Sequence, residues 1–179
     1  MSIRILTGGT ITAPKGFLAG AAQAGIKKPG RYDLTLIYSP TLCSAAGVFT
    51  RNKVQAAPVL LSKAHLSGGK SHGVVVNSGC ANACTGPQGD RDAMRMASAA
   101  AEAVGCSAEE MFVASTGVIG AYLPMDKVLK GIQDAAADMS QDHGALAARA
   151  IMTTDTVPKE TAVQIDLAGT TVTVAAMAK

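Results

Sequence analysis

Two stretches of the chain repeat apolar residues every three or four positions, which is the spacing of one face of an α-helix. The first stretch begins after Gly89 and ends near Gly105, a residue suited to a helix C-cap. Its apolar face consists of Met94, Ala97, Ala101 and Val104. The second stretch opens at Pro124, which the first helical turn tolerates. Its apolar stripe consists of Met125, Val128, Leu129, Ile132, Ala135, Ala136 and Met139.

Short apolar runs bounded by Gly, Pro, Asn or Ser predict β-strands. They cover residues 34–38, 47–50, 58–61, 73–76 and 111–114. Near the end, apolar and polar residues alternate on both sides of Ala168 and Gly169, which predicts a hairpin that delivers Lys179. No repeat or linker interrupts this mixture of helices and strands. We therefore predict one mixed α and β unit over residues 1–179.

Composition limits what the core can be made of. Apolar residues make up 48% of the 179 residues, but aromatic residues only 3%, so small aliphatic side chains must let the elements approach closely. The net charge is +3, and the only basic cluster, Lys27, Lys28 and Arg31, has no interleaved aromatic residues, which argues against nucleic-acid binding. The absence of a signal peptide and of a long apolar run predicts a soluble, cytoplasmic protein.

Several kinds of catalytic site find no support. The sequence has no phosphate-binding Walker loop, dinucleotide fingerprint, nucleophile elbow or zinc-binding His-Glu helix. The cysteines lack metal-site spacing, so we interpret them as free buried thiols in a reducing compartment. They are Cys43, Cys80, Cys84 and Cys106. We interpret His65, His72 and His143 as ordinary surface histidines, because none has a Ser or Cys nucleophile beside it in sequence.

Three polar, glycine-containing or hydroxyl-rich loops carry the remaining candidate chemistry. Loop 77–86 is either a buried turn, in which Asn77 and Asn82 bond neighbouring backbone groups, or a pocket wall. Loop 115–120 is either a common Ser-Thr-Gly turn or a cluster of donors suited to a developing oxyanion. Loop 151–159 reads as a solvated cap or turn. Composition alone favours the structural alternative for all three.

Together with further motifs, these loops change the interpretation. Over essentially its whole length the chain resembles the alpha subunit of ornithine acetyltransferase, also called glutamate N-acetyltransferase. The motifs lie at residues 12–17, 46–50, 53–58, 77–79, 81–86, 114–120, 123–125, 151–156, 158–159 and 176–179. Cys80 departs from the family, which more often has Asn there, but the flanking Asn77 and Asn82 are present, so we do not expect loss of activity.

The resemblance implies an α+β fold: a mixed-sheet αββα-type sandwich, N-terminal-nucleophile-like, of the ornithine acetyltransferase / L-aminopeptidase D-esterase type. It implies an alpha chain that moves acetyl from N2-acetyl-L-ornithine to L-glutamate through an acetyl-threonine intermediate. In this family the precursor cuts itself before a threonine, which becomes the N-terminal nucleophile of a beta chain with its own amine as base. A short Gly-rich segment and the cleavage point are therefore expected after Lys179.

The resemblance also assigns residues. The Thr116 side chain and the Gly117 backbone N–H match the family's oxyanion hole. Thr153 and Lys179 match substrate-binding positions, where the hydroxyl donates a hydrogen bond and the ammonium pairs with an α-carboxylate. The implied partners are the beta chain, in an α2β2 heterotetramer, with N-acetylornithine and glutamate as substrates, and acetyl-CoA as a further donor in some members. We expect no cofactor, no metal, no nucleic acid and no membrane.

Two other functions are left open by the residues. One is an N-terminal-nucleophile aminopeptidase or amidase, whose acyl-enzyme passes its acyl group to water. The other is a non-catalytic amino-acid-binding protein, which keeps the pocket but never forms the nucleophile.

Overall fold

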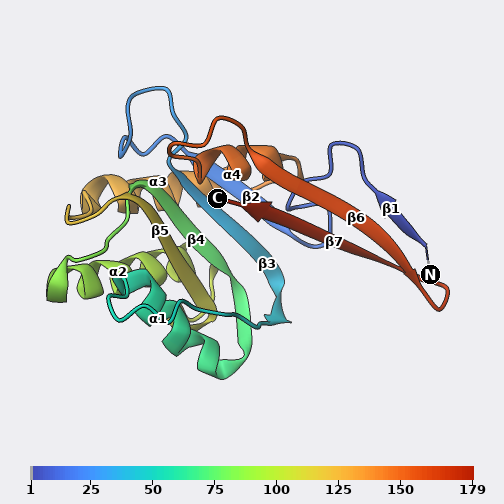
Figure 1. The fold of residues 1–179 in the computed structure, drawn as a ribbon, viewed down its shortest axis with the longest axis horizontal. Coiled ribbons are helices and arrows are strands. Elements are labelled where there is room, and N and C mark those ends of the chain that lie inside the picture. The colour runs from blue at the N-terminus through green and yellow to red at the C-terminus, as the bar shows by residue number, and fades with distance from the viewer. Residues whose placement is uncertain (1) are drawn as a thin grey trace.

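Two β-sheets form the framework of the protein in the computed structural model, which describes residues 2–179 (Figure 1). The larger sheet has the strand order β2-β3-β4-β5, in which only the pair β4 and β5 is parallel. Its strands are β2 (Leu18–Ala22), β3 (Leu34–Ser44), β4 (Lys70–Cys80) and β5 (Met111–Val118). The smaller sheet is antiparallel, with the order β1-β6-β7. It contains β1 (Ile3–Ile5), β6 (Lys159–Leu167) and β7 (Thr170–Ala178).

Helices cover one face of the larger sheet (Figure 1). They are α1 (Ala57–His65), α2 (Gly86–Val104) and α3 (Met125–Ala137). Fully buried Leu34, Leu36 and Val75 of the sheet meet Met96 of α2 and Ile132 of α3 in the main core. The alanines along α2 bring the helix close to the strands, as expected from the scarcity of aromatic residues. None of the helices in residues 2–179 is long and apolar enough to cross a membrane.

The opposite face of the larger sheet is covered by α4 (Gly144–Ala150) and by β7. Ala19 and Ile37 of the sheet pack with Ala147 of α4, and Met177 of β7 packs against the same cluster. One-turn 3-10 helices complete the elements at Leu66–Gly68, Ala108–Glu110 and Gln141–His143. A helical layer, a mixed sheet and a second sheet are thus stacked, which gives three of the four layers of the predicted αββα-type sandwich.

The outer face of the smaller sheet is apolar. Ile3 and Ile5 of β1 pair with Ile165 and Val163 of β6, which pair in turn with β7, and directly paired residues share one face of a sheet. The residues of this face, called the outer apolar face below, are Ile3, Ile5, Val163, Ile165, Val172 and Val174. Ile5 is 73% exposed and Val174 49% exposed, so no part of residues 2–179 covers this face.

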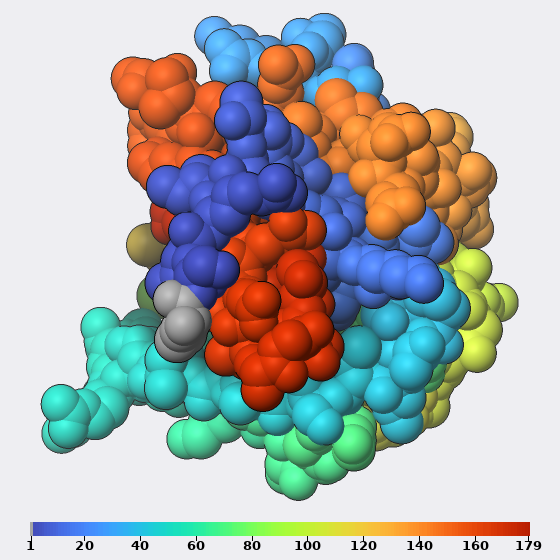
Figure 2. All heavy atoms as spheres, turned by 90° about the vertical axis from the view of Figure 1, so that its right-hand side faces the viewer, coloured from blue at the N-terminus to red at the C-terminus, as the bar shows by residue number. Residues whose placement is uncertain are grey.

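The predicted strands had mixed outcomes. Residues 34–38, 73–76 and 111–114 lie in longer strands, and the terminal hairpin turns at Ala168 and Gly169, both with positive φ (52° and 84°). The strand predicted at residues 58–61 is wrong, because these residues lie in α1. Pro58 occupies the first turn of this helix, and Leu61 and Ser62 face the sheet. Residues 47–50 form no strand. They belong to an exposed extended segment, with Val48 99% exposed, and this segment projects from the body in turquoise (Figure 2).

Both predicted helices exist. Gly105 caps α2 with φ of 76°, and the predicted stripe of α3 faces the core, although Pro124 lies at the N-cap and not in the first turn. The face of α2 is rotated from the prediction: Met94 is 50% exposed, whereas Met96 is fully buried. The buried face is dominated by alanines, which the sequence pattern did not separate from the alanines of the exposed side.

Candidate functional site

The oxyanion residues predicted from the sequence lie at the end of β5, beside the end of β4. Because the two strands are parallel, their C-terminal ends meet, and Thr116 and Gly117 stand opposite Ser78 and Gly79. Gly117 has φ of 136°, and a Cβ at this position would lie 2.3 Å from the carbonyl carbon of Gly79. Only glycine fits there. Thr116 is half-buried and Gly117 is exposed, so both border solvent at the strand end.

A bulge at the end of β4 shapes this edge, with Cys80 opposite both Thr116 and Val118. The Asn77 side chain donates to the Cys80 carbonyl (2.9 Å), and the Cys80 thiol donates to the Ala121 carbonyl (3.2 Å). The thiol thus ties the bulge to the segment after β5. Cys80 is a buried free thiol as predicted, whereas Cys84 is exposed, and Cys43 and Cys106 are half-buried.

Both alternatives for loop 77–86 apply: residues 77–80 end β4, buried Asn82 and Thr85 hold a compact turn, and residues 84–86 line a pocket. The Asn82 side chain donates to the Gly89 carbonyl (2.8 Å) and accepts from the Thr85 hydroxyl (2.7 Å). Asn82 has φ of 47° and is fully buried. This network fixes the start of α2. It adjoins an open pocket of about 800 Å³, which is lined by residues 84–88, 91, 92, 122 and 123 and contains none of the predicted site residues.

The loop between β2 and β3 lies directly on the bulge. Buried Asp33 accepts three backbone N–H bonds that fold this loop, from Ala24 (2.7 Å), Ile26 (2.7 Å) and Lys27 (2.9 Å). A Cβ at Gly79 would lie 2.9 Å from Cγ of Lys27. Sequence reasoning missed Lys27 as a site residue, although the cluster 27–31 was visible as the chain's only basic cluster.

Thr153 is brought to the same edge by two bonds from the sheet side. The Ser78 hydroxyl donates to the Ala150 carbonyl at the end of α4, and the Lys27 ammonium donates to the Met152 carbonyl (2.9 Å). Thr153 lines an open pocket of about 600 Å³ together with Ile26, Lys27, Lys28, Arg31 and Gly79. Burial lowers the pKa of Lys27, and the nearby charges of Arg31 and Lys179 lower it further against the opposing effect of Asp33.

Lys179, directly after β7, is joined to Thr153 through Asp155. The Asp155 carboxylate accepts from Lys159 (2.6 Å), from Lys179 (2.8 Å) and from the Thr153 backbone N–H (3.2 Å). The bonds from Lys159 and Lys179 and that from Thr153 hold the pKa of Asp155 well below its usual range. Because its pKa is depressed, the Asp155 carboxyl stays ionised, and paired with Lys159 and Lys179, at neutral and mildly acidic pH. All four predicted site residues thus lie along one chain of contacts that runs through Gly79, Lys27 and Asp155.

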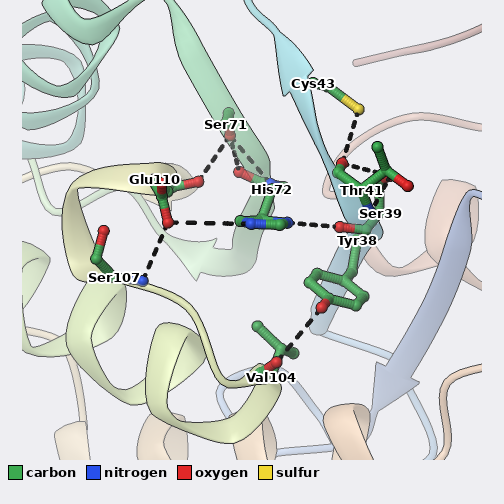
Figure 3. Close-up of polar contacts among 10 residues, drawn as sticks. Tyr38, Ser39, Thr41, Cys43, Ser71, His72, Val104, Ser107 and Glu110 are labelled. Carbon is green, nitrogen blue, oxygen red and sulfur yellow. Dashed lines mark hydrogen bonds and ion pairs between the residues drawn. The ribbon is translucent and has the colours of Figure 1, made fainter.

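Within residues 2–179, the ring nitrogens of the three histidines contact backbone carbonyl oxygens and no Ser or Cys side chain. None of the three is the surface residue that was predicted, because His65, His72 and His143 are all half-buried. The His72 ring stacks on Tyr38 (5.8 Å between centroids), and its Nδ1 lies 2.8 Å from the Ser39 carbonyl oxygen (Figure 3). Its Nε2 lies 4.0 Å from the Glu110 carboxylate, whose other contacts hold the turn before β5. This cluster joins β3, β4 and that turn, at the end of β4 opposite to Thr116, and is structural.

The helical layer and the two sheets, together with the match to solved structures of this fold, place the chain in the N-terminal-nucleophile-like class of α+β proteins. The profile described as the ArgJ family matches residues 18–179. An ArgJ protein of Symbiobacterium thermophilum, named arginine biosynthesis bifunctional protein, is 55% identical over 96% of this chain and 43% of its own length. The chain belongs to the ArgJ family.

Two solved structures share the fold. The crystal structure of arginine biosynthesis bifunctional protein ArgJ from Bacillus halodurans has a TM-score of 0.92 and 40% identity, covering 99% of this chain and 93% of the solved chain. Ornithine acetyltransferase from Mycobacterium tuberculosis, solved in complex with ornithine, has a TM-score of 0.93 and 45% identity, covering 99% of this chain and 94% of the solved chain. By contrast, the chain spans less than half the length of the curated relatives it matches.

Proposed function

We propose that this chain is the alpha part of an acetyltransferase that moves acetyl from N2-acetyl-L-ornithine to L-glutamate in arginine biosynthesis. The observation that carries the proposal is the single chain of contacts that links Thr116 and Gly117 to Thr153 and Lys179, in a member of the ArgJ family. A relative of the same fold was solved with ornithine, a product of this reaction. The proposal also places the protein in the cytoplasm.

The proposed reaction proceeds in two steps, acetylation of the enzyme and transfer of the acetyl group to glutamate. A threonine hydroxyl on the beta chain attacks the acetyl carbonyl, the C–N bond breaks, and ornithine leaves with its amine protonated. The amine of glutamate then attacks the acetyl ester, which releases the threonine hydroxyl and gives N-acetylglutamate. Both steps pass through a tetrahedral oxyanion, which the Thr116 hydroxyl and the Gly117 N–H stabilise. Acetyl-CoA as a second donor would enter at the first step.

Thr153 and Lys179 hold the amino-acid end that the two substrates share. The Lys179 ammonium is oriented by Asp155 (2.8 Å), which also receives the Thr153 N–H, so the two groups are positioned together before substrate arrives. An α-carboxylate placed beside Lys179 would add a charge-assisted hydrogen bond. Because this contact serves both half-reactions, other groups must distinguish the ornithine side chain from the glutamate side chain.

A second chain completes the unit on this proposal. The solved relatives contain chains of nearly this length, of which 93% and 94% are matched, whereas the curated sequences are more than twice as long. This difference fits a precursor that is divided into two chains. The exposed outer apolar face supplies a surface for further elements. Two alpha and two beta chains form the proposed assembly.

The full-length gene product tests the function. We expect it to convert N-acetylornithine and glutamate to ornithine and N-acetylglutamate. With N-acetylornithine alone, we expect one acetyl group to stay bound to the enzyme, because water is excluded as acceptor. Intact mass spectrometry should show two fragments, the second beginning with Thr and carrying that acetyl group.

Other results would favour the alternatives. Release of acetate without glutamate, at a rate similar to the rate with glutamate, would indicate an amidase. A single uncut mass with no acylated species would indicate a binding protein without the nucleophile.

Replacement of Lys179 tests the substrate contact. We expect Lys179→Ala to raise KM for both N-acetylornithine and glutamate by about tenfold to a hundredfold, because a charge-assisted bond contributes ~1.5–3 kcal/mol. The matched control is Lys159→Ala, which removes the other lysine on Asp155 and should change KM less than about threefold. Equal effects of the two variants on KM would show that Lys179 acts only through Asp155.

A further inference from the structure

A groove with four basic side chains opens from the candidate site. The pocket that contains Thr153 shares Lys27 and Arg31 with a neighbouring pocket of about 340 Å³. The second pocket adds Arg149 and is also lined by residues 30, 32, 152 and 158. We call the two together the basic groove and define it by Lys27, Lys28, Arg31 and Arg149. In the proposed acetyl transfer none of these four side chains contacts the substrate, and Lys27 only positions the Met152 carbonyl beside Thr153.

The charge of the basic groove is not neutralised by neighbouring carboxylates. Within residues 2–179, none of its four basic side chains has a carboxylate oxygen within 4.0 Å. Asp33 is occupied by three backbone N–H groups, and Asp155 is occupied by two lysines. Burial raises the pKa of Glu160 against the opposing effect of Arg149. The groove therefore carries a net positive charge.

Of the four basic side chains, only Lys27 is half-buried and held by a hydrogen bond within the described part of the chain, whereas the other three are exposed. Asp33 fixes the backbone from Ala24 to Lys27, and the Lys27 ammonium is bonded to the Met152 carbonyl (2.9 Å). Burial lowers the Lys27 pKa, and the charges of Arg31 and Lys179 lower it further against the opposing effect of Asp33, so the three cations repel one another. A bound anion with two or more charges would remove that repulsion.

We propose that the basic groove binds the phosphate groups of a small organic molecule, a phosphate ester or diphosphate, whose other end points toward Gly79 and Thr153. Arginine and lysine together suit phosphate oxygens, which accept from several donors at once. The four cations are spread over two adjoining pockets, and the single α-carboxylate of an amino-acid substrate could not contact all of them. The source is either a phosphate-bearing acyl donor such as acetyl-CoA, which rests on the proposed function, or a phosphorylated effector.

Titration of the full-length gene product with inorganic pyrophosphate tests the site without any turnover. We expect saturable binding that weakens at least about tenfold in the double variant Lys28→Gln/Arg31→Gln, because two charge-assisted contacts are lost. The matched control, Lys53→Gln/Lys63→Gln, removes the same net charge at exposed positions outside the groove and should bind within about twofold of wild type. Glutarate, a dicarboxylate, should bind more weakly than pyrophosphate.

Turnover separates the two sources. Competition of pyrophosphate with acetyl-CoA, with N-acetylornithine turnover unchanged, identifies the acyl donor. A change in N-acetylornithine turnover identifies an effector, and either result supports the groove. The proposal is overturned if wild type shows no saturable pyrophosphate binding, or if the two double variants, both folded by circular dichroism, weaken it equally. Failure of the acetyl transfer itself would appear as absent turnover with pyrophosphate binding intact.

Discussion

Replacement of Thr116 by Ala is expected to lower kcat for acetyl transfer by about 10²–10³ while the protein folds normally. The hydroxyl would stabilise the oxyanion of both tetrahedral intermediates, and loss of one such donor typically has an effect of this size. Thr116 is half-buried at a strand end, and within residues 2–179 its hydroxyl makes no hydrogen bond to another side chain. We therefore expect the unfolding free energy to change by less than about 1 kcal/mol. Steady-state kinetics and thermal melting measure the two effects.

Two neighbouring variants sharpen that test. Ser115→Ala removes a hydroxyl from the opposite side of the same strand, where it is buried without a hydrogen-bond partner in the described part of the chain. It should leave kcat within about threefold of wild type. Thr116→Ser keeps the hydroxyl and should retain most activity. Near-normal turnover in Thr116→Ala would remove Thr116 from the proposed mechanism.

Replacement of Gly117 by Ala should disrupt the pairing of β4 and β5 at the site. Its Cβ would lie 2.5 Å from the carbonyl oxygen of Gly79 and 2.6 Å from the amide nitrogen of Cys80, and φ of 136° is strained for any residue with a side chain. Backbone cannot move aside as a flexible side chain can. We expect a loss of about 3 kcal/mol or more in unfolding free energy, together with loss of activity. Chemical denaturation measures the first.

Gly120→Ala is the matched control. Gly120 also has a positive φ, 81°, but a Cβ there would have no neighbour within 4 Å. Gly120→Ala should therefore lower the unfolding free energy only by the amount that the left-handed conformation costs an alanine, about 1–2 kcal/mol. If the two variants were equally stable, the close approach of β4 and β5 would not be required.

The elements that the sequence predicted well have strong local patterns. The α3 stripe and the terminal hairpin follow directly from side-chain spacing and from Ala168-Gly169. Residues 58–61 were misassigned because a short apolar run is equally consistent with a strand and with a helix, and only the packing of Leu61 and Ser62 against β5 decides between them. The rotated face of α2 has a related cause: alanines on both sides make the pattern ambiguous.

The site was predicted by family resemblance and not by local pattern. Thr116, Thr153 and Lys179 come from three distant segments, and no spacing rule brings them together. The connecting residues escaped prediction altogether. In the sequence, Asp33 looks like an ordinary acidic loop residue, yet its carboxylate accepts the backbone N–H bonds that fold the loop containing Lys27. Asp155 links two candidate residues only because β7 places Lys179 beside it. Such links depend on tertiary contacts between strands that are far apart in sequence.

The outer apolar face bears on the order of events during biogenesis. A nascent chain that ended at residue 179 would present an uncovered sheet surface with isoleucine and valine side chains, the kind of surface that recruits chaperones or self-associates. Under the proposed two-chain scheme, synthesis as one longer polypeptide would supply the covering segment at a high local concentration. Folding would then come before scission, and separate expression of the halves would give poor yield unless both were made together.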